Sequence, residues 1–185
     1  MILPIYVYGN PVLRKVAINI EKDYPGLREL IANMFETMQF SDGVGLAAPQ
    51  IGKSIRLFTI DATNYEKEDP SAAGFHKAFI NAKITERTGA ETLFNEGCLS
   101  LPGIHEDISR KSIVKIEYYD ENFEFHVETY EGIKARVIQH EYDHIDGKLL
   151  IDHLSPVKRA LIKARIDAIS KGKVETAYKI KIAKK

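Results

Sequence analysis

The pattern of hydrophobic and polar positions along the chain predicts three helices. Apolar residues recur every three or four positions over residues 25–39, directly after Asp23, which suits a helix start. A second helix is expected from Gly132 to about Asp146, and a third from Pro156 to about Ser170. The first two have apolar residues on one face that a folded core would cover.

Strand candidates lie between the first two of these helices and are rich in β-branched and aromatic residues with partial alternation. They cover residues 55–60, 77–84, 113–119 and 123–130. The segments between them, among them 41–52 and 62–76, are rich in glycine, proline or polar residues and are expected to be loops. Strands followed by a helix, without regular alternation, predict the α+β class.

Composition limits the kinds of protein that this chain can be. Its 185 residues suffice for one domain with a real core, and 44% hydrophobic with 28% charged residues is ordinary for a globular protein. The single cysteine, Cys98, excludes an internal disulfide and suits a reducing compartment. Neither a signal peptide nor a membrane-spanning run is recognisable, so a cytoplasmic protein is expected, without membrane contact.

The net charge is zero, but the charges are unevenly distributed. Residues 156–185 contain ten Lys or Arg residues and only two acidic ones, a net charge of +8. We therefore divide the chain into a single catalytic domain, residues 1–170, and a basic C-terminal tail, residues 171–185. Such a tail can follow a phosphate backbone. The alternative is a solvated helix face and a frayed end.

The strongest chemical signal is a pair of histidines, His140 and His144, on the second predicted helix, with Glu141 beside the first. Residues four apart lie on the same helix face, so the two imidazoles can bind one divalent ion. The glutamate is then placed to move protons for the attacking water. This pattern predicts a metal-dependent hydrolase. The alternative is that the two histidines bind no metal.

A third ligand is not evident downstream of this motif. Zinc peptidases with a longer form of the motif have a third histidine where this chain has Leu150, and His153 comes three residues too late. The one glutamate after the helix, Glu175, lies in the basic tail. Upstream, Cys98 lies between glycines and a proline and can supply a thiolate, but a small buried hydrophobe or a nucleophile are alternatives.

Residues 43–52, Gly-Val-Gly-Leu-Ala-Ala-Pro-Gln-Ile-Gly, form a third informative segment. It lacks the third glycine of a dinucleotide-binding loop and the lysine of a phosphate-binding loop. Its small residues permit close approach of an extended ligand. Gln50 is the strongest hydrogen-bond donor in the segment, although it can also be a turn residue that bonds local backbone.

Together these segments resemble the peptide deformylase family. The family signatures G-x-G-x-A-A-x-Q, E-G-C-x-S and Q-H-E-x-D-H occur here at residues 43–50, 96–100 and 139–144, in the family's order. The resemblance extends from the Asn-Pro-Val-Leu-Arg opening at residues 10–14 to the motif helix. It implies antiparallel or mixed sheets around a central helix that carries the metal motif, with further helices near the N- and C-terminal ends.

The resemblance also implies a role for each matched residue. Cys98, His140 and His144 would bind the metal, and Glu141 would be the general base and then the general acid. The Gln50 amide and the Leu99 N–H would form the oxyanion hole. Gly45 would contact the substrate backbone, and Val44 and Val137 would line the pocket for the methionine side chain. The reaction implied is removal of the formyl group from N-terminal formylmethionine, as part of translation and N-terminal processing.

Cofactor and partners follow from the same resemblance. One divalent ion is expected, Fe²⁺ in the cell, with Zn²⁺ or Ni²⁺ replacing it on purification. The partners are nascent formyl-methionyl polypeptides and, transiently, the ribosome through the basic tail. We expect a monomer without specific DNA binding. A peptidase acting on unformylated peptides and a non-catalytic relative are the rival hypotheses.

Overall fold

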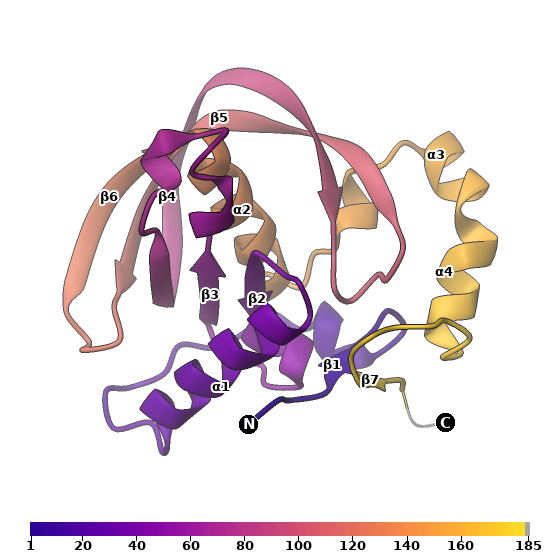
Figure 1. Cartoon of the computed structure of the whole chain (residues 1–185), viewed down its shortest axis with the longest axis horizontal. Coiled ribbons are helices and arrows are strands. Elements are labelled where there is room, and N and C mark those ends of the chain that lie inside the picture. Colours follow the sequence, from indigo (N-terminus) through magenta and orange to yellow (C-terminus); the bar gives the residue numbers. More distant parts are fainter. Residues whose placement is uncertain (184–185) are drawn as a thin grey trace.

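The computed structural model describes residues 1–183 (Figure 1). Its main element is a five-stranded antiparallel sheet in the order β2-β3-β4-β5-β6. The strands are β2 (Gly45–Ala47), β3 (Leu57–Asp61), β4 (His76–Gly97), β5 (His105–Tyr119) and β6 (Phe125–Glu131). With four α-helices beside it, the molecule has the predicted α+β class.

β4 and β5 are far longer than the sequence predicted, because only residues 77–84 and 113–119 carry an apolar pattern. The outer part of β4, residues 85–95, is polar and exposed, and it is held by pairing with β5. Three register shifts interrupt this pairing, and such irregularities bend a strand pair. The two strands accordingly arch over α2 (Figure 1), and the arch brings the end of β4 to the motif helix.

The helices are α1 (Leu27–Phe40), α2 (Gly132–Ile145), α3 (Pro156–Leu161) and α4 (Lys163–Ser170). Short 3-10 turns occupy Pro11–Arg14, Ala48–Ile51, Thr63–Tyr65, Pro70–Ala72 and Leu150–His153. α2 carries the metal motif, and its apolar residues, among them Ile138 and Ile145, are fully buried in the core cluster of the main sheet. This packing fixes the rotation of α2 about its axis and turns the histidine face toward the end of β4.

The prediction of a single C-terminal helix from Pro156 to about Ser170 is wrong in one respect. The structure has two consecutive helices there, α3 and α4. The backbone leaves the helical conformation at Ile162, with φ −97° and ψ 3°. Ile162 is buried with Ile166 and Ile169 of α4, whereas no residue of α3 is buried. The break therefore coincides with the point where the chain begins to pack on the third core cluster.

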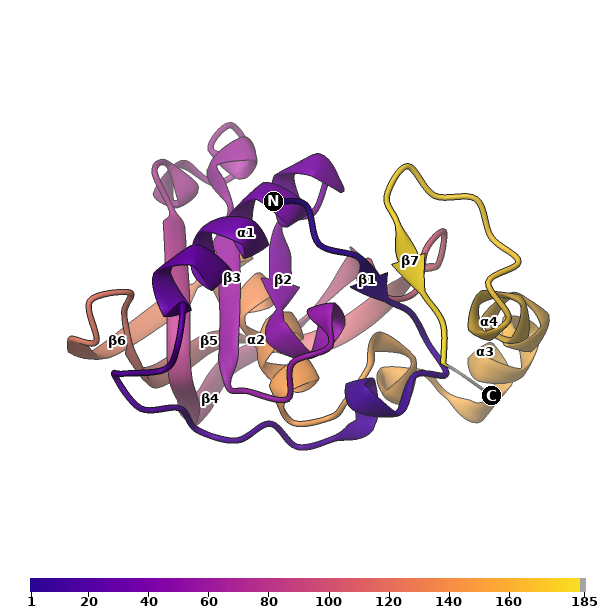
Figure 2. The same ribbon diagram turned by 90° about the horizontal axis from the view of Figure 1, so that it is seen from below.

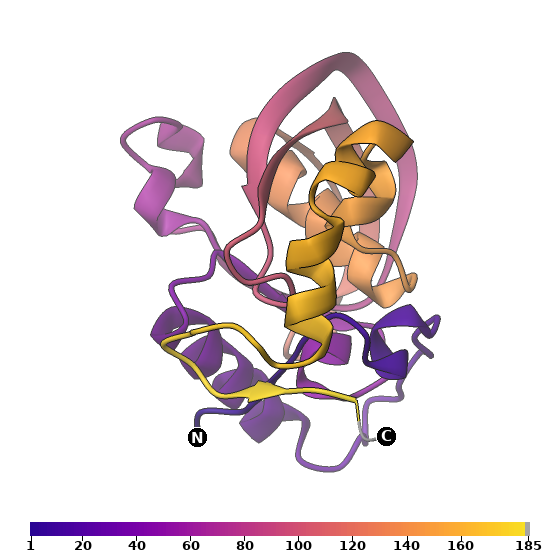
Figure 3. The same ribbon diagram turned by 90° about the vertical axis from the view of Figure 1, so that its right-hand side faces the viewer.

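The chain termini form a second, two-stranded sheet in which β1 (Ile5–Tyr6) pairs in parallel with β7 (Ile180–Lys181). β7 lies beside β1 in two views (Figures 2 and 3). The Ile5 N–H donates to the Lys179 carbonyl at 2.8 Å, and the Val7 N–H to the Lys181 carbonyl at 3.1 Å. The basic segment is thus folded against the body of the protein as far as residue 183, while Lys184 and Lys185 lie outside the described residues.

Among the described residues, no helix has the length and apolar content needed to cross a membrane.

Candidate metal centre and catalytic pocket

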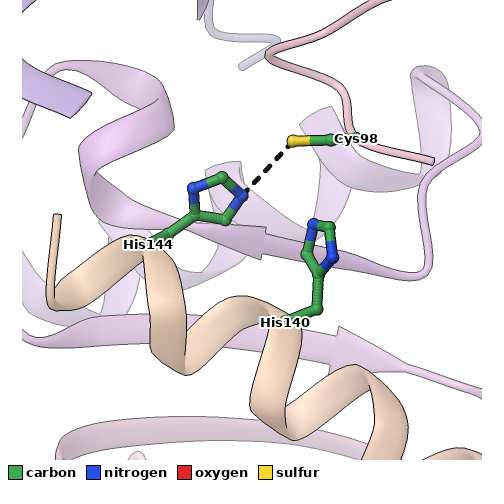
Figure 4. A group of neighbouring side chains, drawn as sticks. All are labelled: Cys98, His140 and His144. Atoms are coloured by element: carbon green, nitrogen blue, oxygen red, sulfur yellow. Dashed lines mark hydrogen bonds between the residues drawn. The ribbon is translucent and has the colours of Figure 1, made fainter. Parts of the chain in front are cut away.

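Three predicted ligands meet where the end of β4 approaches α2. Cys98 directly follows β4, and His140 and His144 project from successive turns of α2 (Figure 4). The Cys98 Sγ lies 3.3 Å from the His144 Nε2, and one donor atom from each of the three residues lies within 4.8 Å of the others. One sulfur and two imidazole nitrogens thus face a common point.

The electrostatics of this cluster favour a thiolate and positive charge. Burial alone would raise the pKa of the Cys98 thiol, but the charge of His144 and hydrogen bonds from both histidines outweigh burial and lower it to about 5. Burial would lower the pKa of His140, yet hydrogen bonds with Cys98 and Glu96 hold it well above its usual value. The cysteine is thus held as a negatively charged thiolate, and a thiolate is suited to bind a cation.

A buried network of charged side chains orients His140. The Glu96 carboxylate, 5% exposed, lies 2.9 Å from the His140 Nδ1 and also accepts from Arg110 Nε at 2.7 Å and Arg136 Nη1 at 3.1 Å. Arg110 also donates to Asp143 at 2.7 Å, and Asp143 contacts His153. Fixing Nδ1 in this way presents the opposite ring nitrogen, Nε2, to a metal.

The two acidic residues of this network, Glu96 and Asp143, have different positions relative to the pocket. Glu96 is buried, contacts the candidate ligand His140 and lines the pocket. Asp143 is paired with Arg110 and His153 and is not among the residues that line the pocket. His153, which is too distant in sequence to serve as a third ligand of the longer peptidase motif, instead anchors Asp143.

Glu141 lies in the same pocket, next to the strand that carries Gly45. Burial raises the pKa of Glu141 to about 7, although the nearby histidines oppose the shift. Its Oε2 has no hydrogen-bond partner among residues 1–183. A Cβ on Gly45 would lie 2.3 Å from the Glu141 Oε1, so only glycine fits at this position.

Gln50 and Leu99 also line the pocket, close to Cys98. Gln50 is 1% exposed; its Oε1 accepts from the Ala47 N–H at 2.8 Å and its Nε2 donates to the Ser100 Oγ at 3.2 Å. The same Nε2 lies 3.8 Å from the Cys98 Sγ. The amide is therefore fixed with its NH₂ end toward the candidate metal centre. Leu99 follows the cysteine at the pocket wall.

A cavity of about 460 Å³ joins these residues. Val44, Gly45 and Val137 all line it, together with Cys98, His140, Glu141, Gln50 and Leu99; His144 is buried behind the wall. Sequence reasoning missed further wall residues, namely Tyr65, Phe94, Arg136, Thr176 and Tyr178. Tyr65 comes from the 62–76 segment, and Thr176 and Tyr178 come from the segment that the sequence placed in a free tail.

Signals for these missed residues were weak in the sequence. Phe94 is an isolated aromatic residue in the polar half of β4. Tyr178 belongs to a short alternation in which residues 174, 176, 178 and 180 are partly buried and residues 173, 175, 177 and 179 are exposed. Such alternation is typical of a strand at a surface. The sequence shows it as well, because Val174, Tyr178 and Ile180 stand at every second or fourth position among the lysines.

The residues present fit a divalent metal ion. Cysteine sulfur and histidine nitrogen are the ligands that zinc and ferrous sites use, and three protein ligands leave a position open, as catalytic centres require. The unpartnered Glu141 Oε2 is consistent with a polar molecule beside that position.

Comparison with known proteins agrees with the geometry. The profile of the family described as polypeptide deformylase matches residues 2–160. The chain is 52% identical to the peptide deformylase of Christiangramia forsetii over 188 residues, covering 98% of this chain and 96% of that protein. It is 40% identical to that of Chlorobaculum parvum, covering 97% and 94% of the two chains.

Solved structures of the same family are also similar. The peptide deformylase of Thermus thermophilus has a TM-score of 0.82 at 39% identity, covering 93% of this chain and 99% of that one. That of Legionella pneumophila has a TM-score of 0.81 at 38% identity, covering 94% and 98%. The chain belongs to the polypeptide deformylase family, and its activity is that family's reaction, hydrolysis of the formyl group on the N-terminal methionine of nascent polypeptides.

Proposed function

We propose that Cys98, His140 and His144 hold the single divalent ion on which this hydrolysis depends. The observation that carries the proposal is the convergence of one sulfur and two nitrogens within 4.8 Å of one another. When bound there, the ion polarises the formyl carbonyl and lowers the pKa of water toward neutrality. All other steps fall to side chains and backbone of this chain.

The donor set also bears on which metal is used. Thiolate and imidazole ligands suit both ferrous iron and zinc. We propose Fe²⁺ in the cell, with Zn²⁺ or Ni²⁺ taking its place during purification in air, because a ferrous thiolate centre is open to oxidation. Metal analysis of protein purified without oxygen tests this. Iron at about one atom per chain is expected, and zinc alone under those conditions would contradict it.

Glu141 transfers protons in the proposed reaction. With its pKa near 7, the carboxylate can take a proton from the attacking water and later give it to the departing amine. Its unpartnered Oε2 is available to bind that water. Glu141→Ala should keep the metal and lose turnover, measured as formate release from formyl-Met-Ala. Near wild-type turnover in metal-loaded Glu141→Ala would remove this role.

Gln50 and Leu99 stabilise the oxygen that becomes negative as the formyl carbon turns tetrahedral. The Gln50 NH₂ group donates to the Ser100 Oγ at 3.2 Å and lies 3.8 Å from the Cys98 Sγ, and the Leu99 N–H adjoins Cys98. Donors fixed in advance cost no reorganisation when charge develops. Both line the same pocket as Cys98 and Glu141.

The remaining wall accepts the substrate. Gly45 lets the peptide backbone approach the strand closely, and Val44 and Val137 supply apolar surface for the methionine side chain. A rival peptidase activity predicts cleavage of Met-Ala-Ser without a formyl group. We expect formate release from formyl-Met-Ala and no cleavage of the unformylated peptide; the reverse result would favour the peptidase.

We also propose that the basic segment contacts ribosomal RNA while the enzyme works as a cytoplasmic monomer. Lys171, Lys173 and Lys179 are exposed, and they belong to the segment that brings Thr176 and Tyr178 to the pocket wall. Contacts between lysines and phosphates weaken as salt concentration rises, so ribosome affinity should depend on ionic strength.

Deleting residues 171–185 would also remove part of the pocket wall, so charge substitution is the cleaner test. The triple variant Lys171→Gln, Lys173→Gln and Lys179→Gln should bind ribosomes more weakly, with a shallower salt dependence, and should retain activity on formyl-Met-Ala. A control with the same charge change uses the exposed residues Lys15, Lys22 and Lys83. Equal affinity of both variants would end the ribosome proposal.

A further inference from the structure

The residues that follow β4 form a tight turn, Cys98–Leu101, which we call the ligand turn because it carries Cys98 and Leu99. The Leu101 N–H donates to the Cys98 carbonyl at 2.9 Å and closes it. Gln50, Tyr8 and Tyr178 each contribute a hydrogen bond from outside that holds the two central residues of the turn, Leu99 and Ser100. Gln50 bonds the Ser100 Oγ at 3.2 Å, the Tyr8 N–H donates to the Ser100 carbonyl at 2.9 Å, and the Tyr178 hydroxyl donates to the Leu99 carbonyl at 2.8 Å.

Two of these three bonds come from the sheet of the chain termini. Tyr8 lies two residues after β1, and Tyr178 lies two residues before β7. The pairing of β1 with β7 places both residues against the ligand turn, where they hold the carbonyls of the consecutive residues Leu99 and Ser100. The two ends of the chain therefore clamp the turn from its outer side.

We propose that Tyr178 is a positioning residue for catalysis, whose hydroxyl, delivered by the C-terminal segment, holds the Leu99 carbonyl and so fixes the direction of the Leu99 N–H and of the Cys98 side chain. This rests on the roles proposed above for Leu99 and Cys98. It gives the C-terminal segment a function within the active site that is separate from its positive charge.

Several features support the assignment. Tyr178 is partly buried at the pocket wall, so its bond to Leu99 is shielded from competing water. Burial raises the pKa of Tyr178 to about 12, which keeps the hydroxyl protonated and donating at neutral pH. The Tyr178 hydroxyl contacts the Leu99 carbonyl, while Lys173 and Lys179 of the same segment remain exposed. Without this bond, the Ser100 side chain and carbonyl would keep their partners, but the carbonyl of the peptide between Leu99 and Ser100 would lose its own and that peptide could rotate.

The test is Tyr178→Phe, which keeps the ring and removes only the hydroxyl. The matched control is Tyr6→Phe, because Tyr6 belongs to the same terminal sheet and has no hydrogen bond to the ligand turn among the described contacts. Three quantities are measured: kcat and KM for formyl-Met-Ala, the rate at which a chelator removes zinc from zinc-loaded protein, and the melting temperature.

We expect Tyr178→Phe to lower kcat by roughly 3- to 10-fold with KM changed less than about twofold, since a lost net hydrogen bond is worth a factor of this size. Zinc release should accelerate by a similar factor, and Tyr6→Phe should change neither quantity. Wild-type kcat and zinc release in Tyr178→Phe would overturn the proposal. Equal effects in both variants, or a lowered melting temperature alone, would also overturn it, because each indicates general loosening of the terminal sheet.

These outcomes are independent of the activity assignment. The wild-type enzyme and Glu141→Ala decide whether the site hydrolyses formyl peptides as proposed, whereas the two tyrosine variants are compared with each other. Zinc release, moreover, is measured without turnover.

Discussion

Replacing Gln50 by leucine tests the oxyanion stabilisation most sharply. The amide is 1% exposed, and its two ends have different tasks. Oε1 accepts from the Ala47 N–H at 2.8 Å, while Nε2 points toward Ser100 and the cysteine. Leucine fills a similar volume but supplies neither group. The substitution therefore has two consequences, one for stability and one for catalysis, and they can be measured separately.

The stability consequence follows from the buried Ala47 N–H, which loses its acceptor. An unsatisfied buried donor costs about 1–3 kcal/mol. For a domain of this size, each kcal/mol lowers the melting temperature by about 2–4 °C. The catalytic consequence follows from the lost Nε2 donor. Removing one oxyanion-hole donor typically lowers kcat by about 100- to 1000-fold, and KM should change little because that bond strengthens only in the transition state.

The assay is formate release from formyl-Met-Ala by zinc-loaded enzyme, below the melting temperature of the variant. Ser100→Ala is the control, because it removes a partner of the Gln50 amide and leaves the amide itself in place. We expect a loss below about tenfold in the control, the scale of one ordinary hydrogen bond. A Gln50→Leu enzyme that is destabilised yet has wild-type kcat would refute the reasoning, since Gln50 would then be only a structural residue.

Three further substitutions probe the surroundings of the site. Gly45→Ala should displace the Glu141 carboxyl, because the added Cβ would lie 2.3 Å from its Oε1; kcat should fall at least about tenfold without metal loss, and an unaffected kcat would argue against the fixed position of Glu141. Glu96→Gln removes the charge beside His140, so metal affinity should fall by about 10- to 100-fold, measured by competition with a chelator; unchanged affinity would contradict the orienting role. For Glu128, burial would raise the pKa, but hydrogen bonds from Tyr118, Tyr130 and Lys77 outweigh it and lower the pKa to about 2. Its stabilisation is therefore present above the pKa of the unfolded carboxyl, near 4.3, and is lost as pH falls from about 5 toward 2. Urea unfolding of wild type and Glu128→Gln should differ at pH 7 and converge only as pH falls to about 2, whereas a constant difference would exclude this linkage.

The sequence predicted much of the fold wherever a local pattern carries the information. The helix of residues 25–39 begins at Leu27 in the structure, because Gly26, in the left-handed region, is its N-cap. The strand predicted at 123–130 is β6, Phe125–Glu131. The outer half of β4 escaped prediction, because its exposed polar residues have no apolar alternation and depend on backbone pairing with β5. The pairing of β1 with β7 joins opposite ends of the chain, and no local pattern reports such a contact.

In the candidate site, too, residues in local motifs were predicted, and residues that depend on contacts between distant parts of the chain were not. Its proposed ligands and the proposed base were found because they occupy fixed positions in short motifs whose chemistry is recognisable. The two arginines that hold Glu96 and the tyrosine that holds Leu99 were missed for a physical reason. Arg110 lies within β5 and Arg136 on α2, and each meets Glu96 only after the sheet has curved over the helix. Tyr178 reaches Leu99 only because the chain returns to its own N-terminus.

The proposed metal centre has one ion held by a single sulfur and two imidazole nitrogens. X-ray absorption at the zinc edge of zinc-loaded protein detects these ligands. We expect one sulfur near 2.3 Å and two nitrogens near 2.0–2.1 Å, with the sulfur signal lost in Cys98→Ser. A zinc site bound only by nitrogen and oxygen in correctly folded wild-type protein would contradict this proposal.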